Sequence, residues 1–263
     1  GNEIWRRVIG GPGNENCRYV EQTADGGYIF CGYCPDSNSS SDSWIVKTDA
    51  LGNPQWANNF GGPSNDVAAR VVATSANSWA VTCDTKILGN GSYDIQVIGL
   101  DSVGDQTFSH IHGDSLTNGC QGMFFSSARR LVSFGETEIH PNSWFDFLIH
   151  VFDEYGNFIR EQSFGGIGAE AMFDMTEAPN GDWLGVGYTN SSSGGLLPIN
   201  LAVSRMDSVG NVLWMQEYGG SGIDLGYRII PALGGGYYVA GRTTQQDEDF
   251  YLLHIDENGV AGF

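Results

Sequence analysis

Short stretches in which apolar residues alternate with polar or small ones recur along the whole chain, separated by turn-forming residues. Residues 28–34 (YIFCGYC) and 79–85 (WAVTCDT) are two examples, and the turns ADGG and SANS precede them. Alternation with a period of two over about seven residues, bounded by Gly, Asn, Asp or Ser, is typical of half-buried β-strands. The pattern therefore predicts an all-β protein.

The strands belong to a repeat that is marked by a pair of glycines. The pair, or its equivalent His112-Gly113, occurs at residues 10–11, 61–62, 112–113, 165–166 and 219–220, and successive copies start 51, 51, 53 and 54 residues apart. After each pair the sequence predicts three strands, the third of which begins at Asp42, Asp94, Asp146, Asn200 or Asp249. An Asp seven residues later opens a Gly-containing turn, and a fourth strand leads into the next glycine pair. Periods of this length are typical of stacked supersecondary units.

Four short strands per unit are what a propeller blade requires, because each twisted sheet buries both faces only against its neighbours. The last unit lacks a fourth strand, whereas the first residues, GNEIWRRVIGG, match the fourth-strand segments GNPQWANNFGG and GNVLWMQEYGG. We therefore predict a single five-bladed β-propeller domain over residues 1–263, with four-stranded antiparallel blades and a ring closed by the N-terminal strand. The predicted blades are approximately 12–62, 63–113, 114–166, 167–220 and 221–263 plus 1–11.

The repeated turn residues have structural duties in this interpretation. Asp49 is expected to cap its turn through the carboxylate, and Gly52 to adopt a positive φ. Trp56 is expected to fill the outer part of a blade, and Gly61-Gly62 to let the backbone cross to the next blade. Since these residues recur in nearly every unit, we assign them to the fold and not to catalysis.

Composition narrows the possible partners. With 31 acidic and 12 basic residues the formal charge is −19, which repels phosphate backbones, so we expect no nucleic-acid partner. No apolar run is long enough to cross a bilayer, so we expect no membrane span. The five cysteines leave at least one thiol unpaired within the chain, and the pair Cys31 and Cys34 is interpreted as small buried residues of a strand.

The elements DGGY, D-x-x-G-N-x-x-W and F-G-G resemble a broad group of glycine-rich propeller repeats found in secreted and surface-attached bacterial proteins. The likeness covers the whole chain. It implies a propeller fold and a secreted or cell-surface location, and it implies no particular activity.

The loops that vary most in length enter the first strands or join the second strand to the third, so they share one face of the predicted propeller. Function is expected on variable loops held by a rigid scaffold. At one first-strand position the units differ in charge, and Asp174 and Arg228 in adjacent blades could form an ion pair there. The complete set at this position is Tyr19, Arg70, Gly122, Asp174 and Arg228.

Two further groups of residues are candidates on this face. His140 and Trp144 lie in the third unit's loop and could bind a sugar ring, although packing of Trp144 at a strand entry explains it equally well. Asp36, Asn38 and Asp42 place oxygen ligands at alternate positions, a weak signal for calcium, because the closing bidentate Glu of a calcium loop is missing. We otherwise expect no cofactor.

Three functions are open at this point. The first is a non-catalytic, monomeric extracellular binding module that recognises a glycan or a surface partner through the variable loops. The second is a glycoside hydrolase with carboxylates in an axial pocket, for which Asp66, Glu170, Asp174 and Asp224 would be candidates. The third is a structural or adhesive unit of a larger surface assembly. We favour the first, because an active site should break the repeat and the acids mostly follow it.

Overall fold

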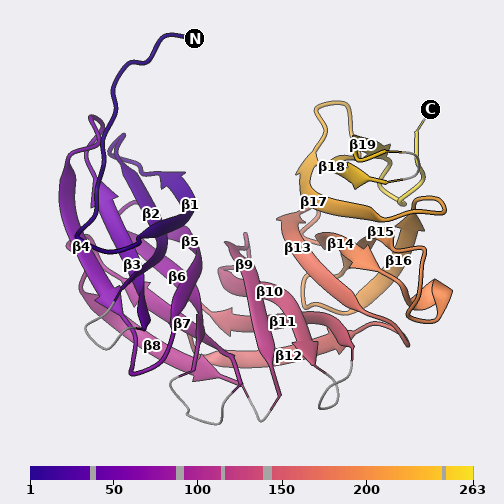
Figure 1. Cartoon of the computed structure of the whole chain (residues 1–263), viewed down its shortest axis with the longest axis horizontal. Coiled ribbons are helices and arrows are strands. Elements are labelled where there is room, and N and C mark those ends of the chain that lie inside the picture. The colour runs from indigo at the N-terminus through magenta and orange to yellow at the C-terminus, as the bar shows by residue number, and fades with distance from the viewer. Residues whose placement is uncertain (36–39, 87–91, 114–115, 139–143, 245–246, 263) are drawn as a thin grey trace. The chain divides into compact units, whose positions relative to one another are not determined.

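The computed structural model describes the chain except for residues 36–39, 87–91, 114–115, 139–143, 245–246 and 263. The described residues form strands and one 3₁₀ turn, Ser191–Ser193. No helix among them is long and apolar enough to cross a membrane. The prediction of an all-β protein is confirmed (Figure 1).

The described part of the chain contains nineteen strands in five antiparallel sheets. The first two sheets contain β1 (Asn16–Gln22), β2 (Tyr28–Pro35), β3 (Ser41–Thr48) and β4 (Pro54–Phe60), then β5 (Val67–Ser75), β6 (Ser78–Thr85), β7 (Asp94–Leu100) and β8 (Gln106–His112). The third contains β9 (Asn118–Phe125), β10 (Arg130–Glu138), β11 (Phe145–Asp153) and β12 (Phe158–Phe164). The last two contain β13 (Glu170–Glu177), β14 (Trp183–Thr189), β15 (Asn200–Met206) and β16 (Val212–Tyr218), then β17 (Asp224–Pro231), β18 (Tyr237–Thr243) and β19 (Asp249–Ile255).

The chain divides into two compact units. The first comprises residues 1–125 and 152–158, and the second comprises residues 126–151 and 159–263. In the first unit, Ile29, Cys31 and Ile45 pack against Val71, Trp79 and their neighbours in the next sheet. In the second unit, Leu184, Val186 and Val203 pack in the same way against the sheet of β17 to β19. In both units the core therefore lies between the faces of successive sheets.

The Asp-Gly turns have the structure that the sequence predicts. The Asp49 carboxylate accepts hydrogen bonds from the backbone N–H groups of Leu51 and Asn53, at 2.8 and 2.9 Å, and Gly52 has a φ of 76°. Trp56 reaches beyond its own sheet, because its indole N–H donates to the Ser102 carbonyl at 3.2 Å. Trp56 therefore ties the first sheet to the Asp-Gly turn of the second.

The predicted ring closure is not seen as a strand. Residues 1–11 contain no strand, and the sheet of β17 to β19 has three strands (Figure 1). The C-terminal residues themselves begin the vacant edge: Ile255 bridges Ala261, and the Gly262 N–H donates to the His254 carbonyl at 2.9 Å. The sequence analysis assigned the whole fourth strand of this sheet to the N-terminal residues. In the structure, Ala261 and Gly262 already pair with the end of β19.

Candidate functional site

A β-bulge interrupts the first strand of four sheets at the same place. The pairing register shifts between Cys17 and Tyr19, between Ala68 and Arg70, between Met172 and Asp174, and between Gly226 and Arg228. A bulge bends the strand and changes the direction of the side chain that follows it. The residues that directly follow these bulges are the four candidates Tyr19, Arg70, Asp174 and Arg228. Their place after a bulge explains why this position departs from the apolar pattern.

Tyr19 and Arg70 come together in the first unit. The Arg70 guanidinium lies over the Tyr19 ring, 4.6 Å from its centroid, and one of its nitrogens is 3.4 Å from the Tyr19 hydroxyl. A cation over an aromatic face at this distance is a favourable interaction. The pair holds both side chains in one arrangement.

Asp174 and Arg228 come together in the second unit, although loosely. The Arg228 guanidinium is 3.9 Å from the Asp174 carboxylate and is largely exposed, whereas Asp174 is buried. Asp174 also accepts the Ile229 backbone N–H at 3.2 Å. The Asp174 carboxylate therefore holds the first strand of the next sheet against its own sheet, which is a structural role.

The acids that begin the first strands are occupied by internal hydrogen bonds. Asp66 accepts the Gly62 N–H at 2.7 Å and the Thr85 hydroxyl, and Asp224 accepts the Gly220 N–H at 2.9 Å. Glu170 accepts the Gly166 N–H at 3.2 Å and the hydroxyls of Thr189 and Ser191 at 2.6 and 2.5 Å. These acids anchor the crossing between sheets, which is the simpler of the two roles that the sequence allows.

Asp146 faces one of these anchored acids. Its carboxyl and that of Glu170 both lie within 2.4 Å of the place that a Cβ would take on Gly165, so a side chain there would displace them. Burial, together with the neighbouring Glu170 carboxylate, raises the pKa of Asp146 to about 7. The two carboxyl groups can therefore share a proton near neutral pH.

Trp144 is exposed beside the loop that joins β14 to β15. Its indole lies 3.6 Å from the Cβ position of Gly195, and 53% of its surface is accessible. The loop makes internal hydrogen bonds: the Gly194 and Gly195 N–H groups donate to the carbonyls of Ser191 and Asn190, each at 3.0 Å. Trp144 thus lies against a fixed, glycine-lined surface.

Ile167 lies beside the same two glycines, and the exposed Leu196 and Leu197 follow them in the loop. Ile167, Leu196 and Leu197 are 75, 72 and 63% exposed, and the Ile167 side chain is 4.0 Å from the Cβ position of Gly194. We call Trp144, Ile167, Leu196 and Leu197 the loop platform. Of the other candidates, His140, Asp36 and Asn38 lie outside the described residues, and Asp42 lies against Gly61 beside Asp66.

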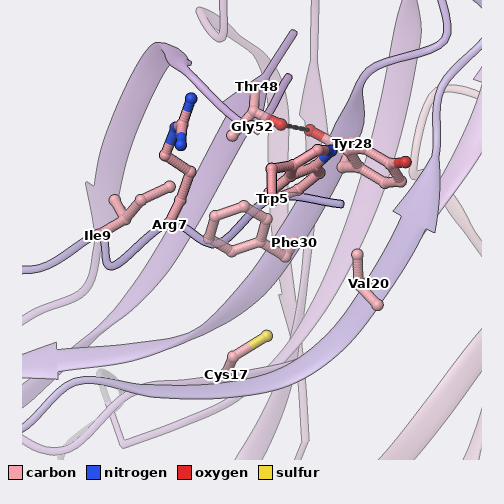
Figure 2. Close-up of a pocket in the computed structure, with 9 residues that line it drawn as sticks. All are labelled: Trp5, Arg7, Ile9, Cys17, Val20, Tyr28, Phe30, Thr48 and Gly52. Carbon is pink, nitrogen blue, oxygen red and sulfur yellow. Dashed lines mark hydrogen bonds between the residues drawn. The ribbon is translucent and has the colours of Figure 1, made fainter. Parts of the chain in front are cut away.

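The sequence did not predict a pocket of about 330 Å³ beside the first sheet. Figure 2 shows Arg7 and Ile9 of the N-terminal segment on one side and Trp5 of the same segment beside Tyr28 and Phe30 on β2, with Cys17 and Val20 on β1. The rings of Trp5 and Tyr28 are 5.9 Å apart and meet edge to face. The lining is mainly apolar, and it comes from four segments: residues 5–9, β1, β2 and residues 48–52.

The sequence also did not predict two internal ion pairs. Lys47 is buried, and its ammonium contacts the Asp25 carboxylate at 2.7 Å and the Gln55 side-chain oxygen at 2.9 Å. At the corresponding place in the fourth sheet, Arg205 contacts Asp182 at 2.9 Å. The signal was a basic residue in an apolar third strand together with an acid in the preceding turn.

The cysteines form no disulfide among the described residues. Cys31 and Cys34 are buried, in agreement with their interpretation as small strand residues, and Cys83 and Cys120 are buried as well. Burial raises the pKa of the Cys83 thiol to about 12. Cys17 alone is exposed.

No protein-family model matches the chain, and no curated protein matches it in sequence. Among solved structures, a protein of unknown function from Dyadobacter fermentans superposes with a TM-score of 0.56 at 10% identity, covering 97% of this chain and 84% of its own. A member of the DUF4221 family from Bacteroides vulgatus gives a TM-score of 0.50 at 10% identity, with 88 and 76% covered. A variant of the Synechocystis apocarotenoid oxygenase gives 0.55 at 10% identity, with 96% of this chain but 61% of the oxygenase covered.

At such low identity these likenesses concern the fold alone. Together with the antiparallel sheets they support a β-propeller-like all-β fold for this chain.

Proposed function

We propose that the protein is a non-catalytic extracellular binding module that recognises a glycan or a surface partner through its variable loops. The observation that carries the proposal is the loop platform, in which an exposed tryptophan lies against the glycines of an ordered loop. Exposed aromatic faces bind sugar rings and apolar side chains, and an ordered loop loses little conformational entropy on binding. An exposed apolar surface of this kind is otherwise unfavourable in water.

The experiment compares Trp144→Ala with Tyr155→Ala on a glycan array and against bacterial surface extracts. Tyr155 is also exposed, but it lies in the short Asp-Gly turn that precedes β12, so it serves as a matched control. Binding should fall by about tenfold or more in Trp144→Ala, as for a central aromatic contact, and stay unchanged in Tyr155→Ala. Equal binding by both variants and the wild type would show that the loop platform does not contact the ligand.

The hydrolase alternative has less support. Asp66, Glu170 and Asp224 already accept N–H or hydroxyl donors that fix them in the fold. The raised pKa of Asp146 is a property that a general acid needs, so Asp146 and the neighbouring Glu170 are the pair to test. Turnover of chromogenic glycosides that disappears in Glu170→Gln would favour this alternative over a binding module.

For the architecture we propose one five-bladed propeller domain whose ring closes when residues 6–10 pair with β19. The support lies in the contacts of the N-terminal segment, which repeat those of a fourth strand. Trp5 and Arg7 lie against Gly52 as Trp56 and Asn58 lie against Gly104. We further propose that the protein is a monomer, that it is secreted or attached to the cell surface, and that it needs no cofactor. Calcium binding is the alternative to this last point.

A further inference from the structure

Two positions on the first two strands of each repeat change their chemistry from unit to unit. One directly precedes the bulge position described above and is Arg18, Ala69, Gln121, Phe173 or Tyr227. The other lies on the second strand and is Tyr33, Asp84, Glu136, Tyr188 or Arg242. Residues that only support the fold are retained in every unit, whereas a ligand site breaks the repeat. These two positions are therefore places where one part of the molecule can carry a site of its own.

In the last two sheets the bulges of β13 and β17 bring such residues together. Phe173 and Tyr227 are the residues that these bulges leave without a strand partner. The two strands lie side by side (Figure 1). The Arg228 guanidinium donates to the Phe173 carbonyl at 3.5 Å and to the Tyr227 carbonyl at 3.2 Å. Arg228 therefore holds the two bulges next to each other.

Three aromatic rings form a row across these strands. The Phe173 ring is in the middle, with centroid distances of 5.7 Å to Tyr188 and 5.5 Å to Tyr227. These distances are typical of rings that interact with each other. Tyr227 is 40% exposed, and Phe173 and Tyr188 are partly exposed. We call Tyr188, Phe173 and Tyr227 the aromatic row.

Charged side chains lie at both ends of the aromatic row. At one end, burial and the neighbouring Glu136 carboxylate raise the pKa of the Tyr188 hydroxyl. At the other end, Arg242 forms an ion pair with Glu248. The hydrogen bond to Glu248 and the nearby Tyr227 hydroxyl raise the pKa of the Arg242 guanidinium. The row thus runs from a carboxylate to an ion pair.

This combination of groups fits a neutral sugar. An aromatic face packs against the apolar face of a sugar ring, and the sugar hydroxyls need donors and acceptors beside it. Arg242 supplies donors and Glu248 supplies acceptors at the same place. In the described part of the chain the hydroxyls of Tyr188 and Tyr227 bond to no other residue, so they are available to a ligand. Carboxylates outnumber the guanidinium at the ends of the row, which disfavours an anionic ligand.

We propose that the aromatic row is a second ligand site, and that it binds a neutral glycan whose sugar rings stack on the row and whose hydroxyls bond to Arg242 and Glu248. The site shares no residue with the loop platform, and it rests on the proposed function only for the class of ligand. Every residue of the site belongs to the compact unit of residues 126–151 and 159–263.

The test measures the binding of neutral gluco-, galacto-, manno- and xylo-oligosaccharides to the full-length protein by isothermal titration calorimetry. At least one of them should bind, and Tyr227→Ala and Arg242→Gln should each weaken its binding by about tenfold or more, as for a central contact. Tyr155→Ala is the matched control, because it removes an exposed tyrosine outside the row, and it should bind like the wild type. Arg242→Gln changes a partly exposed side chain, so it keeps the test decisive if Tyr227→Ala does not fold.

Trp144→Ala separates the aromatic row from the loop platform. Weaker binding in the Tyr227 and Arg242 variants with full binding in Trp144→Ala would support the row even if the loop platform binds nothing. Weaker binding in Trp144→Ala alone would place the sugar on the loop platform and overturn the second site, while the proposed function would stand. Failure of all the neutral oligosaccharides to bind, or tighter binding of oligogalacturonate than of any of them, would also overturn it.

Discussion

At the scale of single residues, the Asp146–Glu170 pair shows how the repeat tolerates two acids in contact. The position of Asp146 is taken by Asn200 in the next sheet, where an amide faces Asp224 across Gly219. The Asn200 amide nitrogen donates to Glu217 at 2.8 Å, and its neutral side chain adds no charge beside Asp224. Two carboxyl groups at this place repel each other when both are ionised, which favours a proton on one of them.

A pH dependence follows from the raised pKa of Asp146. Because its pKa is raised, Asp146 holds its proton in the folded protein but loses it in the unfolded chain between about pH 4 and pH 7. The free energy of unfolding should therefore decrease as the pH rises through this range. Asp146→Asn should remove this part of the decrease, and it should be more stable than the wild type at pH 8 by on the order of 1–3 kcal/mol. Urea unfolding at several pH values measures this, with Asp105→Asn at an exposed position as the charge-matched control.

A second residue-scale prediction concerns Lys47. Asp25→Ala should reduce the free energy of unfolding by about 1–3 kcal/mol, because the buried ammonium keeps only the Gln55 side chain and the Thr48 carbonyl as partners. The hydrogen bond from Lys47 holds the pKa of Asp25 below its usual value, so this stabilisation should be present above about pH 4 and lost in acid. The double variant with Lys47→Met should recover much of the loss at pH 7. Additive losses in a double-mutant cycle would show that the two residues act independently.

At the scale of an element, the Asp-Gly turn depends on glycine for two separate reasons. Gly104 has a φ of 87°, and a Cβ there would lie 2.6–2.8 Å from Asn58 and Trp56 of the preceding sheet. The sequence shows the first reason, since Gly follows Asp in a tight turn. The second reason becomes visible only when the neighbouring sheet is in place.

Gly104→Ala should therefore lower the free energy of unfolding by about 1–3 kcal/mol, through backbone strain and displacement of Trp56. Gly234→Ala is the control, because a Cβ at Gly234 meets no atom within 4 Å. Thermal unfolding followed by circular dichroism compares the two. A loss at Gly104 that is no larger than that at Gly234 would mean that Trp56 does not constrain the turn.

At the scale of the whole molecule, the proposed closure has a defined register. The pairing of Ile45 with Asn58 in the first sheet, carried to the last repeat, sets Leu252 opposite Arg7. In a Cys17→Ser background, Arg7→Cys with Leu252→Cys should form an intramolecular disulfide on oxidation, whereas Arg7→Cys with Leu233→Cys should not. Non-reducing electrophoresis and peptide mapping detect the bond, and a disulfide-linked dimer from the first pair would contradict closure within one chain.

The sequence by itself determined the strands, the turns and the repeat, because alternation of period two and the Asp-Gly signal are local properties of the chain. It also identified Tyr19, Arg70, Asp174 and Arg228 as one class of position, although only the structure shows the bulge that places them there. The tertiary structure decided which acids are anchored, where Trp144 lies relative to Gly195, and that the C-terminal residues begin the outer edge of the last sheet. These features depend on contacts between segments far apart in the chain, for which the identity of a single residue carries no signal.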